Sequence, residues 1–266
     1  MTSSIIGILL MISGCTNRDT IVDKSKLLGS DYRLFQNTPA WELAKSVEDG
    51  DTAAIRLNSG KNKELIDYRD AVYGQTLLSI AVYRQNYNSV RTLLELGADP
   101  NKQDTYNGTS PLMVAAGLGG GGFVHPYADP RYLEILLKYG GDPNAVQDGK
   151  DRKRGNRTSF TPLLIACESG VFDYVKILVD AGADINAANK HGFSALYAAT
   201  ISGNPDIVMY LLEKGADFKQ PMYTNVKGEK KYILDALEVW GFEKNSGEYK
   251  KEIQIEDWLK SHGTVH

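Results

Sequence analysis

Few side chains in this sequence are placed for catalysis or metal binding. The four histidines are His125, His191, His262 and His266. Neither they nor the two cysteines have the spacing of a metal site, a catalytic triad or a paired-cysteine motif. A glycine-rich run at residues 117–122 could cradle a phosphate, but no Gly-Lys-Ser or Gly-Lys-Thr follows it. The sequence therefore predicts that the chain is not an enzyme and holds no metal or cofactor.

Cys15 has surroundings that favour covalent chemistry. It follows a short apolar run, residues 5–12, which is too short to span a bilayer as a helix. The order Ile12-Ser13-Gly14-Cys15 resembles the lipobox of bacterial lipoproteins. In that family the cysteine thiol receives a diacylglyceryl group, the chain is cut before the cysteine, and the new amino terminus is usually acylated. The resemblance therefore implies lipidation at Cys15.

The lipobox resemblance also implies a location. Residues 1–14 would be the signal peptide, and residues 15–36 a lipidated polar tether. Thr16 follows the cysteine, and in Gram-negative lipoproteins the absence of Asp there usually implies sorting to the outer membrane. We therefore expect a protein on the periplasmic face of a membrane, held by several acyl chains such as palmitate. Residues 1–4 carry no Lys or Arg, and if the signal is bypassed, for example by initiation at Met11, a cytoplasmic form is expected instead.

The composition describes an ordinary folded body. Of the 266 residues, 42% are hydrophobic and 24% are charged, and the formal net charge is −3. This balance does not indicate a nucleic-acid partner, which would favour an excess of basic residues. If Cys15 is lipidated, Cys167 is the remaining thiol. Its place beside Ala166 among small helical residues predicts a buried, inert side chain.

A nine-residue pattern that occurs four times provides the frame for these residues. It runs Leu-Leu-x-x-Gly-Ala-Asp-x-Asn in its fullest form and occupies residues 93–101, 136–144, 178–186 and 211–219. The apolar pair ends a helix, the glycine permits the left-handed turn that stops it, and Asp or Asn holds the next turn. Upstream of each copy a Thr or Ser can cap a first helix; these residues are Thr76, Ser110, Thr161 and Ser194. A unit repeated in this way predicts a stacked array.

This order of cap, small-residue helix, second helix and Gly-Ala-Asp turn resembles the ankyrin repeat over residues 74–222. The resemblance implies an all-α solenoid of about six helix pairs with short β-turn fingers. The His usual in the family's start motif is replaced by Ser79, Met113, Leu164 and Tyr197. The Gly usual between the two helices is Gln85 in the first copy. We expect these changes to remove polar links between repeats and to make individual repeats less stable.

The array is expected at residues 37–264. Its repeats are placed at residues 40–73, 74–106, 107–157, 158–191 and 192–222, with a degenerate C-terminal cap at residues 223–264. The first repeat and the cap fit the pattern poorly. This is expected of terminal repeats, because they must present a polar outer face.

Two intervals between repeats are longer than the ankyrin unit of about 33 residues. Successive glycines of the pattern lie 43, 42 and 33 residues apart. Counting from the caps places one insertion between the two helices of the second copy, within residues 117–130. The other lengthens the turn between repeats, within residues 147–160. Insertions in repeat proteins fall in loops, often on the binding face.

Three groups of residues are candidates for contact with a partner. In the first insertion, Phe123, His125 and Tyr127 either anchor a partner or pack on the array. The second insertion holds a basic group, which either grips an acidic patch or lipid headgroups or forms a solvated loop. The basic group is Arg152, Lys153, Arg154 and Arg157. On the concave face that ankyrin proteins use, the positions after the small residues include Tyr83, Arg84, Glu168 and Ile201.

Together these features predict a lipid-anchored protein-binding module. Bacterial ankyrin lipoproteins include immunity proteins that neutralise phospholipase effectors of type VI secretion systems, and this chain is similar to them in its signal, tether and modest array. The resemblance implies a secreted lipase toxin as the protein partner, occluded by stoichiometric binding. Two alternatives stay open: a periplasmic scaffold or chaperone for an endogenous enzyme, and a cytosolic ankyrin adaptor if the signal is not used. No nucleic-acid partner is expected.

Overall fold

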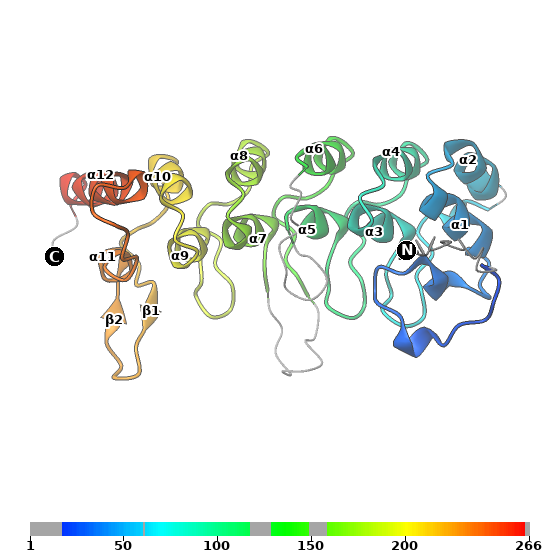
Figure 1. Ribbon diagram of the computed structural model, residues 1–266, viewed down its shortest axis with the longest axis horizontal. Helices are drawn as coiled ribbons and strands as arrows, with labels where there is room; N and C mark the ends of the chain where they lie inside the picture. Colours follow the sequence, from blue (N-terminus) through cyan, green and yellow to red (C-terminus); the bar gives the residue numbers. More distant parts are fainter. Residues whose placement is uncertain (1–17, 61, 118–128, 149–158, 264–266) are drawn as a thin grey trace, which may run out of the picture.

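The computed structural model describes residues 18–60, 62–117, 129–148 and 159–263, and in this part of the chain the helices form two rows (Figure 1). The inner row comprises α1 (Trp41–Asp49), α3 (Leu77–Tyr83), α5 (Pro111–Ala115), α7 (Pro162–Ser169), α9 (Ala195–Ile201) and α11 (Ile233–Leu237). The outer row comprises α2 (Thr52–Gly60), α4 (Tyr87–Glu95), α6 (Arg131–Lys138), α8 (Phe172–Asp180), α10 (Pro205–Glu213) and α12 (Gly247–Ser261). Inner and outer helices alternate along the chain, and each pair packs on the next. The predicted all-α solenoid of helix pairs is confirmed.

The inner helices of the central repeats begin at the predicted caps. The hydroxyl oxygens of Thr76, Ser110, Thr161 and Ser194 accept hydrogen bonds at 3.2–3.3 Å from the backbone N–H three residues ahead. Each cap therefore satisfies one of the N–H groups that the first helical turn leaves without an intrahelical partner. Pro111 follows one of these caps at the first helical position, where a missing N–H does no harm.

The outer helices of these repeats end at the predicted glycines. Gly97, Gly140, Gly182 and Gly215 have φ between 88° and 95°, in the left-handed region that side chains disfavour. The residue after each glycine folds back on the helix, as Ala98 does when its N–H donates to the Leu93 carbonyl at 3.0 Å. The recurring glycine is thus required by backbone geometry.

The asparagines of the pattern link neighbouring repeats. Each side chain donates to the carbonyl of the next turn glycine and accepts from the N–H of the next Asp. For Asn101 the distances are 2.8 Å to the Gly140 oxygen and 2.7 Å to the Asp142 nitrogen. Asn144 and Asn186 make the same pair of bonds with the repeats that follow them. This ladder supplies polar links that the sequence analysis did not foresee.

The residues that replace the family's His serve packing. Ser79, Met113 and Leu164 are buried between the repeats, while Tyr197 stacks on an aromatic neighbour. The asparagine ladder provides polar links between repeats at another position of the pattern.

One hydrophobic core runs the length of the described array. Leu93, Leu136, Leu178 and Leu211, from the apolar pairs of the pattern, are fully buried in it. Cys167 is buried in the same core, as predicted, and burial raises the pKa of its thiol. A neutral, enclosed thiol is a poor nucleophile.

The loops between repeats project from the inner row as fingers (Figure 1). The buried Asp104 carboxylate holds its finger by accepting backbone N–H groups of residues 106–109. Burial raises the pKa of Asp104 against the opposing effect of these bonds. In the finger that carries the second insertion, the Gln147 N–H donates to the Phe160 carbonyl at 2.8 Å and closes the base.

The N-terminal segment, residues 18–36, differs from the predicted polar tether. It contains the short 3-10 helices η1 (Lys24–Lys26) and η2 (Tyr32–Phe35), and it packs on α1 below the inner row (Figure 1). Leu34 and Phe35 are fully buried in the core of the array. The tether prediction is wrong for these residues, because burying two large apolar side chains is lower in free energy than leaving them exposed in a solvated linker.

The C-terminal end is closed by α11, α12 and a short hairpin. The hairpin strands β1 (Tyr223–Thr224) and β2 (Lys230–Lys231) are antiparallel, with Tyr223 opposite Lys231. Ile255 and Leu259 of α12 are buried against the array and its other face is polar, as a terminal cap requires. None of the helices in the described ranges combines the length and apolar character needed to cross a membrane.

Candidate protein-binding surface

The last turns of the inner helices form a row along one face of the array. Arg84 follows α3, Glu168 lies near the end of α7, and Ile201 ends α9. Neighbouring ends meet, since the Ser202 hydroxyl donates to the Glu168 carbonyl at 3.4 Å. Ile201 is 57% exposed, although it is large and apolar. We call this row the inner face.

Burial affects two predicted members of the inner face, Tyr83 and Glu168. Tyr83 packs against the core rather than facing solvent, and burial raises the pKa of its hydroxyl. It therefore offers less contact area than predicted. Glu168 is exposed, as predicted, but partial burial raises the pKa of its carboxyl.

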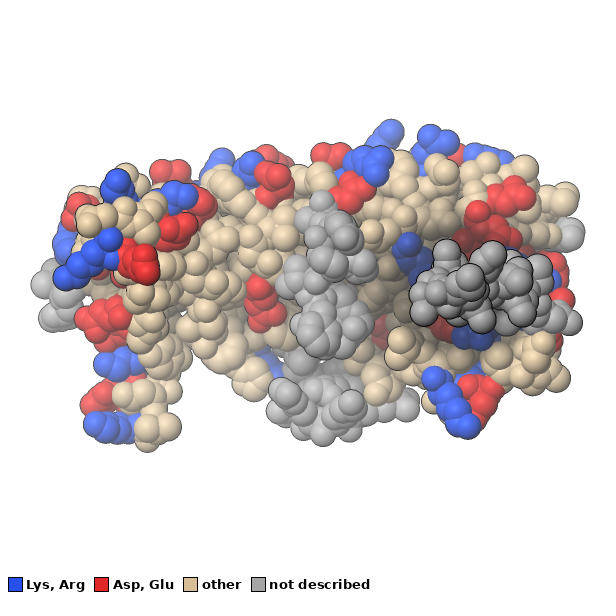
Figure 2. Space-filling view, in the orientation of Figure 1, with Lys and Arg blue, Asp and Glu red and all other residues tan. Residues whose placement is uncertain are grey.

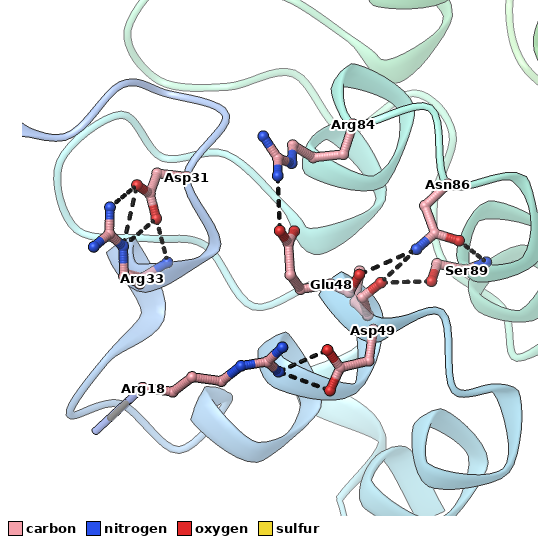
Figure 3. Close-up of polar contacts among 9 residues, drawn as sticks. Arg18, Asp31, Arg33, Glu48, Asp49, Arg84, Asn86 and Ser89 are labelled. Carbon is pink, nitrogen blue, oxygen red and sulfur yellow. Dashed lines mark hydrogen bonds and ion pairs between the residues drawn. The ribbon is translucent and has the colours of Figure 1, made fainter. Parts of the chain in front are cut away.

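The N-terminal end of the inner face carries paired charges around a pocket of about 590 Å³. Arg18, Arg33 and Arg84 line it, and each makes an ion pair (Figure 3). The N···O distances are 2.6 Å from Arg18 to Asp49, 2.6 Å from Arg33 to Asp31 and 2.8 Å from Arg84 to Glu48. The N-terminal segment supplies two of these arginines and the helices supply the third. The pocket thus exists because the segment folds back onto the array.

The ion pairs shift the pKa values of Arg18, Arg33 and Asp31. The hydrogen bond from Arg18 to Asp49 raises the pKa of the Arg18 guanidinium. At Asp31, burial acts to raise the pKa, but hydrogen bonds from the Arg33 side chain and backbone outweigh it and lower the pKa of the carboxyl. A partner therefore meets a surface on which guanidinium and carboxylate groups lie side by side.

Gln36 fixes the N-terminal segment from within. Its side chain is buried, and its oxygen accepts the Val22 N–H at 3.0 Å while its nitrogen donates to the Thr20 carbonyl at 2.9 Å. A further bond joins the segment to α1, because the Trp41 indole N–H donates to the Asp19 carboxylate at 2.9 Å. The segment is therefore held at its beginning as well as at Leu34 and Phe35.

An aromatic cluster lies around the start of α9, the helix whose last residue, Ile201, is at the C-terminal end of the inner face. The rings of Phe193 and Tyr197 stack with centroids 4.3 Å apart and planes 10° from parallel, and Tyr223 of β1 lies 6.4 Å from Tyr197. The Trp240 indole N–H donates to the Thr200 carbonyl at 2.7 Å, at the residue before Ile201. Sequence analysis missed this cluster, although Tyr197 had been singled out as a departure from the family.

Several predicted site residues lie outside the described residues. They are Cys15, Phe123, His125, Tyr127, Arg152, Lys153, Arg154 and Arg157. In the described part, charged side chains gather over the outer helices and at the two ends, and few lie between them (Figure 2). No group of three or more His, Cys, Asp or Glu residues within these ranges could hold a metal ion.

Comparison with known proteins identifies the repeat. The model of the family described as ankyrin repeats (3 copies) matches residues 43–147 and 127–222. Protein PhlB of Serratia liquefaciens is 31% identical over 163 residues, which are 60% of this chain and 61% of that protein. Ankyrin repeat and SOCS box protein 6 of Mus musculus is 35% identical over 120 residues, which are 44% of this chain and 26% of that protein.

The chain thus spans less than two thirds of the length of these two relatives. Proteins with these repeats are typically binding modules rather than enzymes, in agreement with the paired charges and the exposed apolar side chains of the inner face. Since the family model covers more than half of the sequence, the chain belongs to the ankyrin repeat family and is a protein-protein interaction module.

Proposed function

We propose that the chain inhibits a secreted phospholipase by covering it with the inner face. The observation that carries the proposal is the row of inner-helix ends, which leaves Ile201 and Arg84 in solvent between a charged pocket and an aromatic cluster. Ile201 is 57% exposed, so the array leaves most of its surface free for a partner, whereas Arg84 is already paired with Glu48. A surface of this kind suits a partner protein, for which a typical interface buries about 1,600 Å² in total.

In this proposal the protein is lipidated at Cys15 and faces the periplasm from the outer membrane. The support is the resemblance of residues 12–15 to a lipobox and of the whole chain to ankyrin immunity lipoproteins. The partner is then a lipase effector of type VI secretion, and inhibition is stoichiometric occlusion of its active-site mouth. The lipid anchor keeps the inhibitor at the surface that the toxin attacks.

Co-expression tests the inhibition. A lipase encoded beside this gene is directed to the periplasm of cells that carry the wild-type chain, the Ile201→Asp variant or the Leu57→Asp variant. Leu57 is an exposed residue of α2, in the outer row, and serves as the matched control. We expect the wild type and Leu57→Asp to protect the cells and Ile201→Asp to protect them far less.

The result that overturns the proposal is equal survival with and without the chain. A pull-down tests the alternative. If the chain captures a housekeeping enzyme instead of a lipase, and no toxin gene lies nearby, the inner face belongs to a scaffold or chaperone. Lipidation is tested separately by labelling with a palmitate analogue. We expect the label in the wild type and its loss in Cys15→Ser, whereas label-free wild-type protein would exclude the anchor.

A further inference from the structure

The N-terminal segment is attached to the array almost from its first described residue. Arg18 pairs with Asp49 at the end of α1. Thr20 and Val22 are held through their backbones by Gln36. A chain fixed at so many points cannot act as a long flexible spacer between residue 18 and the first helix pair.

This attachment limits how far the array can stand from a lipid at Cys15. Two residues, Thr16 and Asn17, lie between Cys15 and Arg18. The three steps from Cys15 to Arg18 span at most about 11 Å when fully extended. The polar layer on each side of a bilayer is itself about 5–7 Å thick. With the diacylglyceryl group inserted, the N-terminal segment must therefore lie at or close to the lipid headgroups.

The segment carries side chains suited to that position. Ile21 and Leu28 are 77% and 76% exposed, although both are large and apolar. The Lys26 side chain on η1 is 81% exposed and makes an exposed ion pair with Asp23 at 3.4 Å, which it can exchange for a lipid phosphate. Over residues 18–36 the basic side chains are Arg18, Lys24, Lys26 and Arg33 and the acidic ones are Asp19, Asp23 and Asp31, so the segment has a small positive excess. Apolar side chains next to basic ones favour an interface between lipid tails and anionic headgroups.

We propose that residues 18–36 form a membrane-contact surface that holds the array directly against the bilayer. Ile21 and Leu28 enter the interfacial layer, and Lys26 meets lipid phosphates. The inference rests on the proposed lipidation of Cys15. Leu28 also lines the charged pocket with Arg18 and Arg84, so this end of the inner face opens beside the membrane. A lipase bound there lies next to the membrane lipid that is its substrate.

Depth-dependent quenching tests the proposal on the acylated full-length protein. The protein is placed in vesicles of phosphatidylethanolamine and phosphatidylglycerol that contain a quencher-labelled lipid. An environment-sensitive fluorophore is attached to Ile21→Cys or Leu28→Cys. The matched control is Leu57→Cys, because Leu57 is 67% exposed on α2, in the outer row of the first helix pair. Native Cys167 is buried and its pKa is raised, so it should escape labelling.

We expect quenching at positions 21 and 28 several-fold stronger than at position 57. Insertion of about ten Gly and Ser residues between Asn17 and Arg18 adds a flexible coil of about 17 Å and should reduce the quenching at 28 toward the control. The same insertion in the hairpin between Val226 and Lys227 should leave it unchanged. Equal quenching at 28 and 57 would overturn the membrane contact, as would a probe that responds to the purified lipase but not to vesicles.

The two proposals fail in different ways. If the wild-type protein takes up no palmitate analogue and does not sediment with vesicles, the lipid anchor itself is absent. If it is acylated and sediments while the probes at 21 and 28 stay in water, the membrane contact alone is wrong.

Discussion

The two ends of the inner face offer a partner different chemistry. At the N-terminal end, Arg33 and Arg84 are already paired with carboxylates around a pocket. At the C-terminal end, Phe193 and Tyr197 stack at the start of α9, and the same helix ends at the exposed Ile201. Paired charges must exchange one partner for another on binding, so they affect orientation and association rate more than affinity. Aromatic and aliphatic surface that becomes buried contributes affinity directly. We expect the C-terminal end to hold the partner and the N-terminal end to orient it.

The largest expected effect comes from breaking the packing that creates the N-terminal end. Phe35→Ala removes a fully buried ring and should lower the free energy of unfolding of the first helix pair by about 3–5 kcal/mol. Hydrogen exchange of residues 18–49 should accelerate while that of α9 and α10 stays unchanged. Leu57→Ala, at an exposed position, is the control. Exchange that accelerates equally along the whole array would show that the two ends do not behave independently.

A smaller effect is expected at the aromatic end. Tyr197→Ala removes the stacking partner of Phe193 and should weaken partner binding by about 2 kcal/mol, or about 30-fold in Kd, with little effect on the rate of association. Calorimetric titration measures the change. Tyr139→Ala, at an exposed position after α6 in the outer row, controls for the loss of a tyrosine. If the two variants bind equally well, the aromatic cluster does not contact the partner.

At the charged end, we expect a substitution to change the salt dependence of the association rate rather than the rate of dissociation. Arg84→Gln breaks the exposed pair with Glu48, which contributes at most about 1 kcal/mol to stability. We expect a few-fold slower association at low ionic strength and no difference from the wild type at about 1 M salt, where the Debye length is about 3 Å. Stopped-flow mixing at graded salt separates the two regimes. A change confined to the dissociation rate would contradict the assignment of orientation to this end.

The smallest expected effect is a pH dependence of the N-terminal segment. The folded-state pKa of Asp31 lies below its ordinary value of 3.8, because its bonds with Arg33 outweigh the effect of burial. The stability that this pair contributes is therefore fully present above about pH 4 and is lost as the pH falls through the lowered pKa. The anisotropy of a fluorophore on Leu28→Cys should fall over that range. Asp31→Asn should remove the step, and superimposable curves for the two proteins would exclude Asp31 as its source.

The repeat frame was predictable because its determinants are local. Thr161 caps the helix that begins at the next residue by accepting the Leu164 N–H, and Gly182 stops a helix that ends two residues before it. Neither depends on a distant residue, so the pattern of residue types is sufficient. The asparagine ladder was missed because its bonds join positions in neighbouring repeats, such as Asn144 and Asp184, whose alignment requires the stacked array.

The candidate site was predicted only in part for the same reason. Arg84 and Ile201 were found because the repeat fixes their place on the inner face. The N-terminal segment has no helical periodicity, and the burial of Leu34 and Phe35 depends on the surface that α1 presents to them. Tyr197 and Tyr223 are far apart in the sequence and meet only when β1 packs beside α9.

The sequence by itself determined the repeat, its helix starts and stops, and the outward positions of Arg84 and Ile201, since these follow from short-range capping and backbone geometry. Tertiary structure alone decided that residues 18–36 are part of the array, that Arg18, Arg33 and Arg84 surround one pocket, and that the opposite end is aromatic. Those arrangements bring together side chains from segments that share no local pattern, and they are stabilised by burial that exists only once the repeats have stacked.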